Sequence, residues 1–228
     1  MRALRILLVL AVVLGGIFVG VDRLAVAYAE SEAAGRVKLS GARSESIEVD
    51  IKGFPFLTQV AAKRLDEVDV RATGIQAQAG DRKIRVGELN VTLRDVTVTG
   101  DWTGARAGSA HGTALISYAD LTAASEREAT VAYGGDGKVK VTGSVKVLGR
   151  SLTRTVLSTV SVVNGDTIRF HADEVPGEGI PGVEDLVRTR TDFESTLRVL
   201  PGMKVEKVEP RPEGLAVAVT GTDMALAG

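Results

Sequence analysis

The sequence of 228 residues contains no cysteine, so it can form neither a disulfide framework nor a thiolate metal site. It also lacks a basic excess, because 28 Lys and Arg stand against 29 Asp and Glu, for a formal net charge of −1. A protein that binds the phosphates of nucleic acid needs a basic surface. The charge balance therefore argues against a nucleic-acid partner.

Aromatic residues are also scarce, at 4% of the chain, with Trp102 as the single tryptophan. Glycan-cleaving sites usually carry aromatic platforms, and the many carboxylates of this sequence are scattered. The sequence contains no G-x-S-x-G nucleophile motif and no H-E-x-x-H metal motif, and His111 and His171 lie far apart. We therefore expect no catalytic residue, no metal site and no cofactor. A carboxylate-based glycan hydrolase is the least favoured alternative.

The N-terminal segment is strongly apolar. Arg2 and Arg5 precede an uncharged run from Ile6 to Val21, as in a secretory signal peptide or a signal anchor. The run is slightly shorter than the roughly 20 residues that a transmembrane helix needs. For a retained anchor the basic residues stay in the cytoplasm and the rest of the chain lies outside it. The remaining alternative for this segment is a buried helix of a soluble protein.

Two features bear on whether this segment is removed. Small residues at Ala25, Ala27 and Ala29 offer signal-peptidase sites. Against cleavage, the pattern from Asp22 to Val37 reads as a helix that continues from the apolar run, which favours a retained anchor. We expect residues 1–29 to be a signal peptide or signal anchor and residues 30–228 to be a single domain.

Most of the remaining chain alternates apolar and polar residues, as in "SIEVDI", "DEVDVRAT" and "ELNVTLRDVTVTG". The alternation changes phase at Arg94-Asp95, which predicts a bulge or a sharp bend. Asn164-Gly165 predicts a tight hairpin turn, and a short helix is expected at about Val183–Thr191. Roughly nine to twelve strands are too many for one sheet with a solvated face, so the sheet must curl or close.

We therefore predict an α+β, β-dominated fold. It would be a single elongated, strongly curved antiparallel sheet or barrel, with a few helices, around an apolar interior. Alternation alone does not decide whether that interior is a filled core or an open apolar cavity.

The stretch "GFPFLTQV" interrupts the strands with a corner. Gly53 permits a tight turn and Pro55 is preset for the first turn of a helix, with Phe54 and Phe56 on either side. Leu57 and Val60 continue an apolar helical face. One interpretation is that the phenylalanines plug the end of a core. The other is that the corner lines or gates an apolar cavity.

Trp102 lies in the Gly-rich stretch "TGDWTGARAG". It either folds back on the sheet or meets a cavity rim or membrane interface.

Three stretches together carry a resemblance to a known family. "I-x-G-F-P-F-L-T-Q" after an export helix, "ISYADL" from Ile116 to Leu121, and "LPGMKVEKVEPRPEGLAVAVTGTDMAL" near the C-terminus resemble the LmeA-like phospholipid-binding proteins of actinobacterial cell envelopes. The resemblance implies an elongated, tubular, β-barrel-like domain that encloses a hydrophobic cavity. It also implies binding of phospholipid, including phosphatidylinositol-type lipid, and a supporting role in envelope glycolipid assembly or maintenance.

The sequence and the resemblance together lead to one hypothesis of function. The protein would be an exported or membrane-tethered phospholipid-binding protein on the extracytoplasmic side of the cytoplasmic membrane, holding or shuttling a lipid. Its partners would be phospholipid and the outer face of that membrane. The expected lipid contacts are Phe54, Phe56, Leu57, Val60 and Trp102. The alternative is a structural or interaction protein of the envelope, with a filled β core and no ligand.

Overall fold

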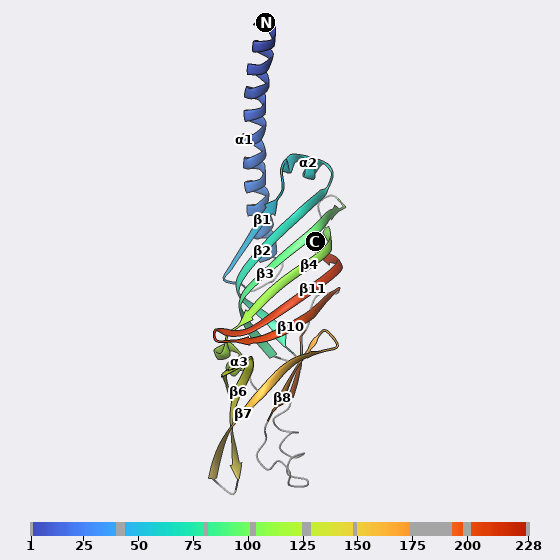
Figure 1. The fold of residues 1–228 in the computed structure, drawn as a ribbon. Coiled ribbons are helices and arrows are strands. Elements are labelled where there is room, and N and C mark those ends of the chain that lie inside the picture. The colour runs from blue at the N-terminus through green and yellow to red at the C-terminus, as the bar shows by residue number, and fades with distance from the viewer. Residues whose placement is uncertain are drawn as a thin grey trace.

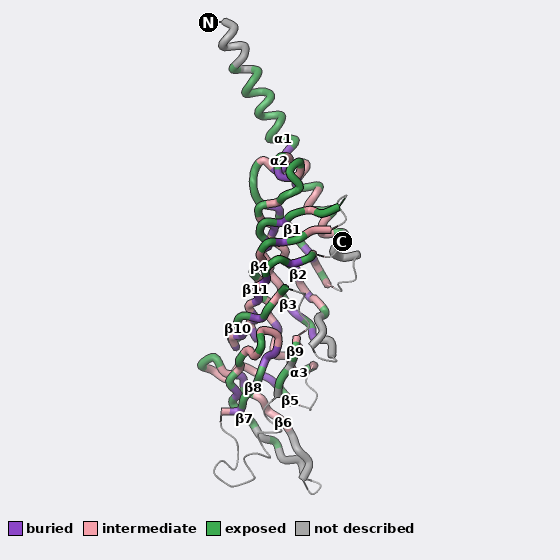
Figure 2. Tube along the Cα trace, turned by 90° about the vertical axis from the view of Figure 1, so that its right-hand side faces the viewer, coloured by how far each residue is buried: buried purple, intermediate pink, exposed green. Residues whose placement is uncertain are grey.

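The structure is a computed structural model in which residues 2–39, 44–79, 82–100, 104–124, 129–147, 150–173, 193–197 and 202–226 are described. One long helix leads into an elongated body of strands that continues roughly along the helix direction (Figure 1). The upper part of the helix stands clear of the strands and is exposed (Figure 2).

Three helices and two antiparallel sheets make up the described chain. The helices are α1 (Arg2–Leu39), α2 (Phe56–Ala61) and α3 (Tyr118–Ala124). The six-stranded sheet has the order β1 (Ser46–Lys52), β2 (Arg64–Ala79), β3 (Arg82–Thr99), β4 (Gly104–Ile116), β11 (Gly214–Leu226), β10 (Met203–Arg211). The five-stranded sheet has the order β5 (Ala129–Gly135), β6 (Lys138–Val147), β7 (Arg150–Val163), β8 (Thr167–Ala172), β9 (Phe193–Thr196).

The alternation of the sequence places one face of the six-stranded sheet inward. Cross-strand partners point to the same side of a sheet, so the register defines rows of side chains. The central row on the inner face consists of Val49, Val70, Val91, Gly112, Val219 and Val205. The rows on either side run from Ile47 to Val208 and from Ile51 to Met203. The intervening rows carry polar residues and face outward.

A line of bends crosses four strands of this sheet. One residue in each of these strands has no paired partner in the neighbouring strand: Asp66, Asp95, Gly108 and Asp223. The register is the same before and after these residues. Asp95 and Asp223 have φ angles of 52° and 51°, the left-handed conformation that Asp tolerates better than most residues. Because each strand changes phase here, Leu93 and Val96 are both buried although they lie three residues apart. The bend predicted at Arg94-Asp95 is confirmed.

The two sheets meet at the turn between β7 and β8. Asn164 and Gly165 have φ angles of 56° and 74°, as a type I′ turn requires, so the predicted hairpin is confirmed. The carbonyl of Gly165 accepts a hydrogen bond of 2.6 Å from the Val205 N–H of β10. On the opposite side, α3 covers the junction, where the Tyr118 hydroxyl donates to the Arg211 carbonyl at 2.8 Å. Burial raises the pKa of Tyr118 to about 12.

The predicted class is confirmed, because antiparallel strands dominate and helices are few. The strands form two sheets rather than the single sheet that was predicted, and barrel closure is not found. Within the described residues, β1 and β10 are the two edges of the six-stranded sheet and do not pair with each other. The helix expected at about Val183–Thr191 lies outside the described residues.

Candidate functional site

The inner face of the six-stranded sheet carries most of the buried apolar residues of its strands. Two core clusters cover its ends. The helix-side cluster includes Val26 of α1, Phe56 of α2 and Leu93 of β3. The far cluster joins Val217 and Leu215 of β11 to residues of the five-stranded sheet.

Between the clusters several aliphatic residues of the inner face are only half-buried, although Ile47 and Ala72 in the same part of the face are buried. This surface, here called the apolar trough, consists of Val49, Val70, Val91, Leu89 and Ala114. The first three border the helix-side cluster, and the last two border the far cluster. Aliphatic side chains that stay partly uncovered on one face of a sheet can hold an apolar ligand, since burying each CH₂ contributes about 0.8 kcal/mol.

The GFPFL corner closes the helix-side end of the sheet. Gln59 is buried (8% exposed), and its amide links the ends of two strands. Its Nε2 donates to the Lys52 carbonyl at 3.2 Å, and its Oε1 accepts from the Asp66 N–H at 2.9 Å. Gly53 has a φ angle of +99°, and a Cβ there would lie 2.5 Å from Gln59 Nε2. Glycine is therefore required both by the backbone and by the space that Gln59 fills.

A buried carboxylate ties this corner to α1. Asp22 is fully withdrawn from solvent (0% exposed), and its Oδ1 accepts the Leu57 N–H of α2 at 2.8 Å. Its Oδ2 pairs with Arg23 Nη2 at 3.0 Å. The carboxylate thus satisfies a backbone donor that the first turn of a helix leaves free, across 35 positions of sequence. Lower on α1, Glu30 Oε1 accepts the Ile51 N–H of edge strand β1 at 2.8 Å, which covers that edge.

The hydrogen bond between Asp22 and the Leu57 N–H of α2 leads to a prediction about stability. Asp22→Ala should lower the thermal unfolding midpoint, because the Leu57 N–H would lose its acceptor in a buried place. Asp22→Asn keeps an acceptor oxygen and should lose less. Differential scanning calorimetry of both variants measures the order. Equal midpoints for Asp22→Ala and the parent chain would mean that the contact does not hold α2.

The structure separates the residues that the sequence singled out. Phe56 is 5% exposed within the helix-side cluster, and Val60 packs half-buried against the same cluster. Leu57 is half-buried, whereas Phe54 is 57% exposed and its ring lies 5.1 Å from the Arg23 guanidinium carbon. Trp102 lies outside the described residues. The corner therefore brings Phe56 and Val60 into the helix-side cluster, leaves Leu57 half-buried, and exposes Phe54.

Sequence reasoning missed Asp22 and Gln59. The available signal for Asp22 was a carboxylate directly after an apolar run, where an unpaired charge would be costly. Gln59 had no signal in a single sequence, because an exposed and a buried glutamine look alike there.

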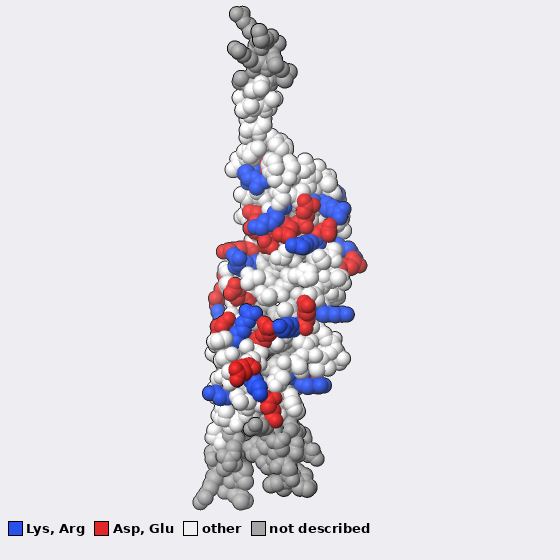
Figure 3. All heavy atoms as spheres, viewed as in Figure 1, with Lys and Arg blue, Asp and Glu red and all other residues white. Residues whose placement is uncertain are grey.

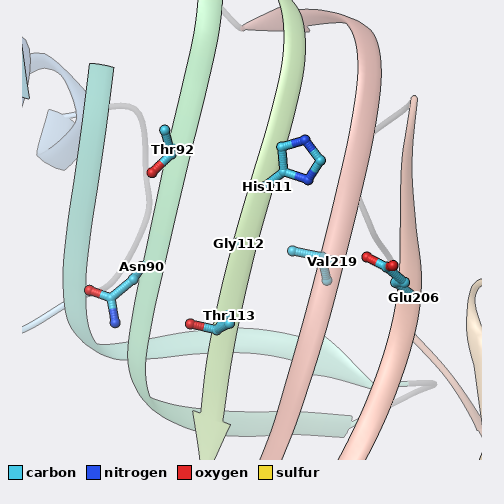
Figure 4. A pocket seen from close by; sticks show the side chains of 7 residues that line it. All are labelled: Asn90, Thr92, His111, Gly112, Thr113, Glu206 and Val219. Atoms are coloured by element: carbon cyan, nitrogen blue, oxygen red, sulfur yellow. The ribbon is translucent and has the colours of Figure 1, made fainter. Parts of the chain in front are cut away.

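A hollow on the opposite, polar face differs in character (Figure 4). It measures about 280 Å³ and is shallow and open. Its lining residues are Asn90, Thr92, His111, Gly112, Thr113, Glu206 and Val219. Ligand pockets are usually larger, more enclosed and mostly apolar. An enclosed apolar cavity, as expected from the sequence, is not shown among the described residues, and the apolar trough is a better candidate site than this polar hollow.

Comparison with known proteins gives one match. The family model described as LmeA-like phospholipid-binding matches residues 20–220. The matched range takes in Asp22, the GFPFL corner and every residue of the apolar trough. No curated protein and no solved structure matches the chain.

Proposed function

Because the chain belongs to the LmeA-like phospholipid-binding family, we propose that it holds a phospholipid with at least one acyl chain along the apolar trough. The observation that carries the proposal is the half-buried aliphatic surface between two filled clusters. About ten buried CH₂ groups would contribute about 8 kcal/mol, which corresponds to a dissociation constant near 1 μM. Binding of that strength needs no charged clamp on the inner face.

Under this proposal the corner residues have different tasks. Leu57 and Val60 form the wall at the helix-side end, and the buried Phe56 holds that wall in place. Phe54 meets the bilayer rather than the bound chain. Trp102, which lies outside the described residues, stays a proposed rim contact on the sequence pattern alone.

The same proposal treats α1 as a retained membrane anchor. The stretch Leu10–Gly35 is long and apolar enough to span a membrane, by length and composition. Cleavage at Ala25, Ala27 or Ala29 would remove Asp22, which caps α2. Cleavage at Ala27 or Ala29 would also remove Val26 from the helix-side cluster. Residues 1–29 would then serve both as an anchor and as part of the fold of the domain.

We further propose that the domain lies on the extracytoplasmic side. Arg2 and Arg5 precede the apolar run, and basic residues of this kind favour the cytoplasmic side. Holding or shuttling phospholipid there, including a phosphatidylinositol-type lipid, would serve the assembly or maintenance of envelope glycolipids. This role is binding and delivery, not catalysis.

A photoreactive phospholipid tests the lipid site on the full-length chain. The probe carries its reactive group within an acyl chain and is supplied in vesicles that contain the protein. After irradiation, mass spectrometry should find labelled peptides from β2, β3 and β4 that include Val70, Val91 or Ala114. Labelling confined to Ile6–Val21 would indicate an anchored protein with a filled core, as the alternative hypothesis states.

A further inference from the structure

One face of α1 carries aliphatic residues that are followed by a tyrosine where the helix meets the strands. Ile17, Val21, Leu24 and Tyr28 follow one another at spacings of three or four, so they share a face. Leu24 and Tyr28 are each 74% exposed, although they lie beyond the charged pair Asp22-Arg23. The neighbouring Ala25, Val26 and Ala29 pack against the helix-side cluster instead. The domain therefore covers one apolar side of this helical stretch and leaves a second apolar side, with Leu24 and Tyr28, exposed.

The length of the uncharged run explains why that bare side matters. From Ile6 to Val21 an α-helix rises about 24 Å, at about 1.5 Å per residue, whereas a bilayer hydrocarbon core is about 30 Å thick. A bilayer around this run therefore reaches past Val21 by about one helical turn. That depth places Leu24 in hydrocarbon and Tyr28 at the interface, where tyrosine is enriched.

The charged pair at this depth is arranged to tolerate a membrane. The Asp22 carboxylate is 0% exposed and hydrogen-bonded to the Leu57 N–H, so it faces protein rather than lipid. Arg23 is half exposed, and its long side chain can carry the guanidinium out to lipid phosphates. In Figure 3 the stretch of α1 directly below the grey region shows no charged atoms, a basic patch lies lower, where the helix approaches the strands, and charges of both signs gather over the strands.

Phe54 lies at the same level from a different segment. Its ring, 57% exposed, lies 5.1 Å from the Arg23 guanidinium carbon. The loop that carries it is held by Gln59 on one side and by α2, bonded to Asp22, on the other. The connection between β1 and α2, which carries Phe54, lies beside the point where α1 leaves the strands (Figure 1).

We infer that Leu24, Tyr28, Arg23 and Phe54 form a membrane seat, a surface that docks the domain rigidly on the bilayer that α1 crosses. The partner is the lipid interface itself, with the aromatic and aliphatic side chains in the headgroup and upper acyl region and Arg23 at the phosphates. The seat would hold the strands upright and keep the GFPFL corner in contact with lipid. The inference rests on the membrane anchor of the proposed function, but not on the apolar trough.

The absence of cysteine permits a clean test. Single-cysteine variants Phe54→Cys and Tyr28→Cys of the full chain are labelled with the fluorophore NBD and placed in phosphatidylcholine vesicles containing phosphatidylglycerol. Leu157→Cys, 40% exposed on β7 of the five-stranded sheet, is the matched control. Circular dichroism confirms that each variant is folded. We expect blue-shifted emission and at least about threefold weaker iodide quenching at positions 54 and 28 than at 157.

Two results would contradict the membrane seat, and only one of them would also contradict the membrane anchor. If the protein floats with the vesicles but iodide quenches position 54 as strongly as 157, the seat is wrong and the anchor stands. If the protein does not float with the vesicles, the seat and the anchor are both wrong. In neither case is the lipid site of the trough decided, because labelling by the photoreactive lipid measures that separately.

Discussion

Ala114→Asp should lower phospholipid uptake by at least tenfold in a protein that still folds. Ala114 lies on the inner face of β4, half-buried at the border of the far cluster. A carboxylate at this position would have to leave water when an acyl chain binds over it, and an unpaired polar group costs about 1–3 kcal/mol or more. A loss of about 1.4 kcal/mol is already a factor of ten in affinity.

The neighbouring residue provides the control. Thr113 lies on the same strand, exposed on the outer polar face, so Thr113→Asp adds the same charge on the other side of the sheet. Exposed substitutions of this kind usually change free energies by about 0.5 kcal/mol, so uptake should change by about twofold at most. Both variants are compared with the parent chain by uptake of a fluorescent phospholipid from vesicles, after their unfolding midpoints are measured.

Equal uptake by the two folded variants would place the lipid elsewhere. If Ala114→Asp does not fold, Val91→Thr tests the same surface, because threonine has nearly the shape of valine and adds only a hydroxyl. It should weaken uptake in the same direction and by a smaller factor.

Gly53→Ala should be the most destabilising single change at the corner. The new Cβ would adopt a φ of +99° and approach Gln59 Nε2 to 2.5 Å. Gln59 can move only by giving up its bonds to the Lys52 carbonyl and the Asp66 N–H. Left-handed backbone costs a non-glycine residue about 1–2 kcal/mol, and losing buried hydrogen bonds adds about 1–3 kcal/mol.

A substitution at Gly135 separates the backbone cost from the cost of losing the Gln59 hydrogen bonds. Gly135 has a φ of +83°, and a Cβ there meets nothing within 4 Å. Gly135→Ala should therefore lose only the backbone part, lowering the unfolding midpoint by about 2–6 °C, whereas Gly53→Ala should lower it by roughly 10 °C. Equal shifts for both variants would mean that the Gln59 bridge contributes nothing to stability.

Local patterns predicted much of this fold because the physics behind them is local. The bend at Asp95, the turn at Asn164-Gly165 and the helix after Pro55 each follow from a few neighbouring residues. Barrel closure was expected but not found, because closure depends on whether distant edge strands meet. Alternation specifies the faces of a strand and not its neighbours.

The candidate site shows the same division. Val70 and Val68 look alike in sequence, yet the first is half-buried and the second is buried in the helix-side cluster. The difference arises from where α1 and α2 pack, through contacts such as that of Asp22 with Leu57, 35 residues away. The sequence therefore predicted an apolar interior. Which of its residues stay uncovered could be seen only from the packing of the helices in the structure.

The lipid content of the purified protein shows directly whether the chain holds a phospholipid. A chain that begins at Gly20, where the family match starts, keeps Asp22 and Val26 but loses most of the exposed apolar run. It is purified without detergent, checked for folding by circular dichroism, and extracted with organic solvent for mass spectrometry. We expect about one phospholipid per protein molecule. A folded protein that carries no lipid and takes none from vesicles would contradict that expectation.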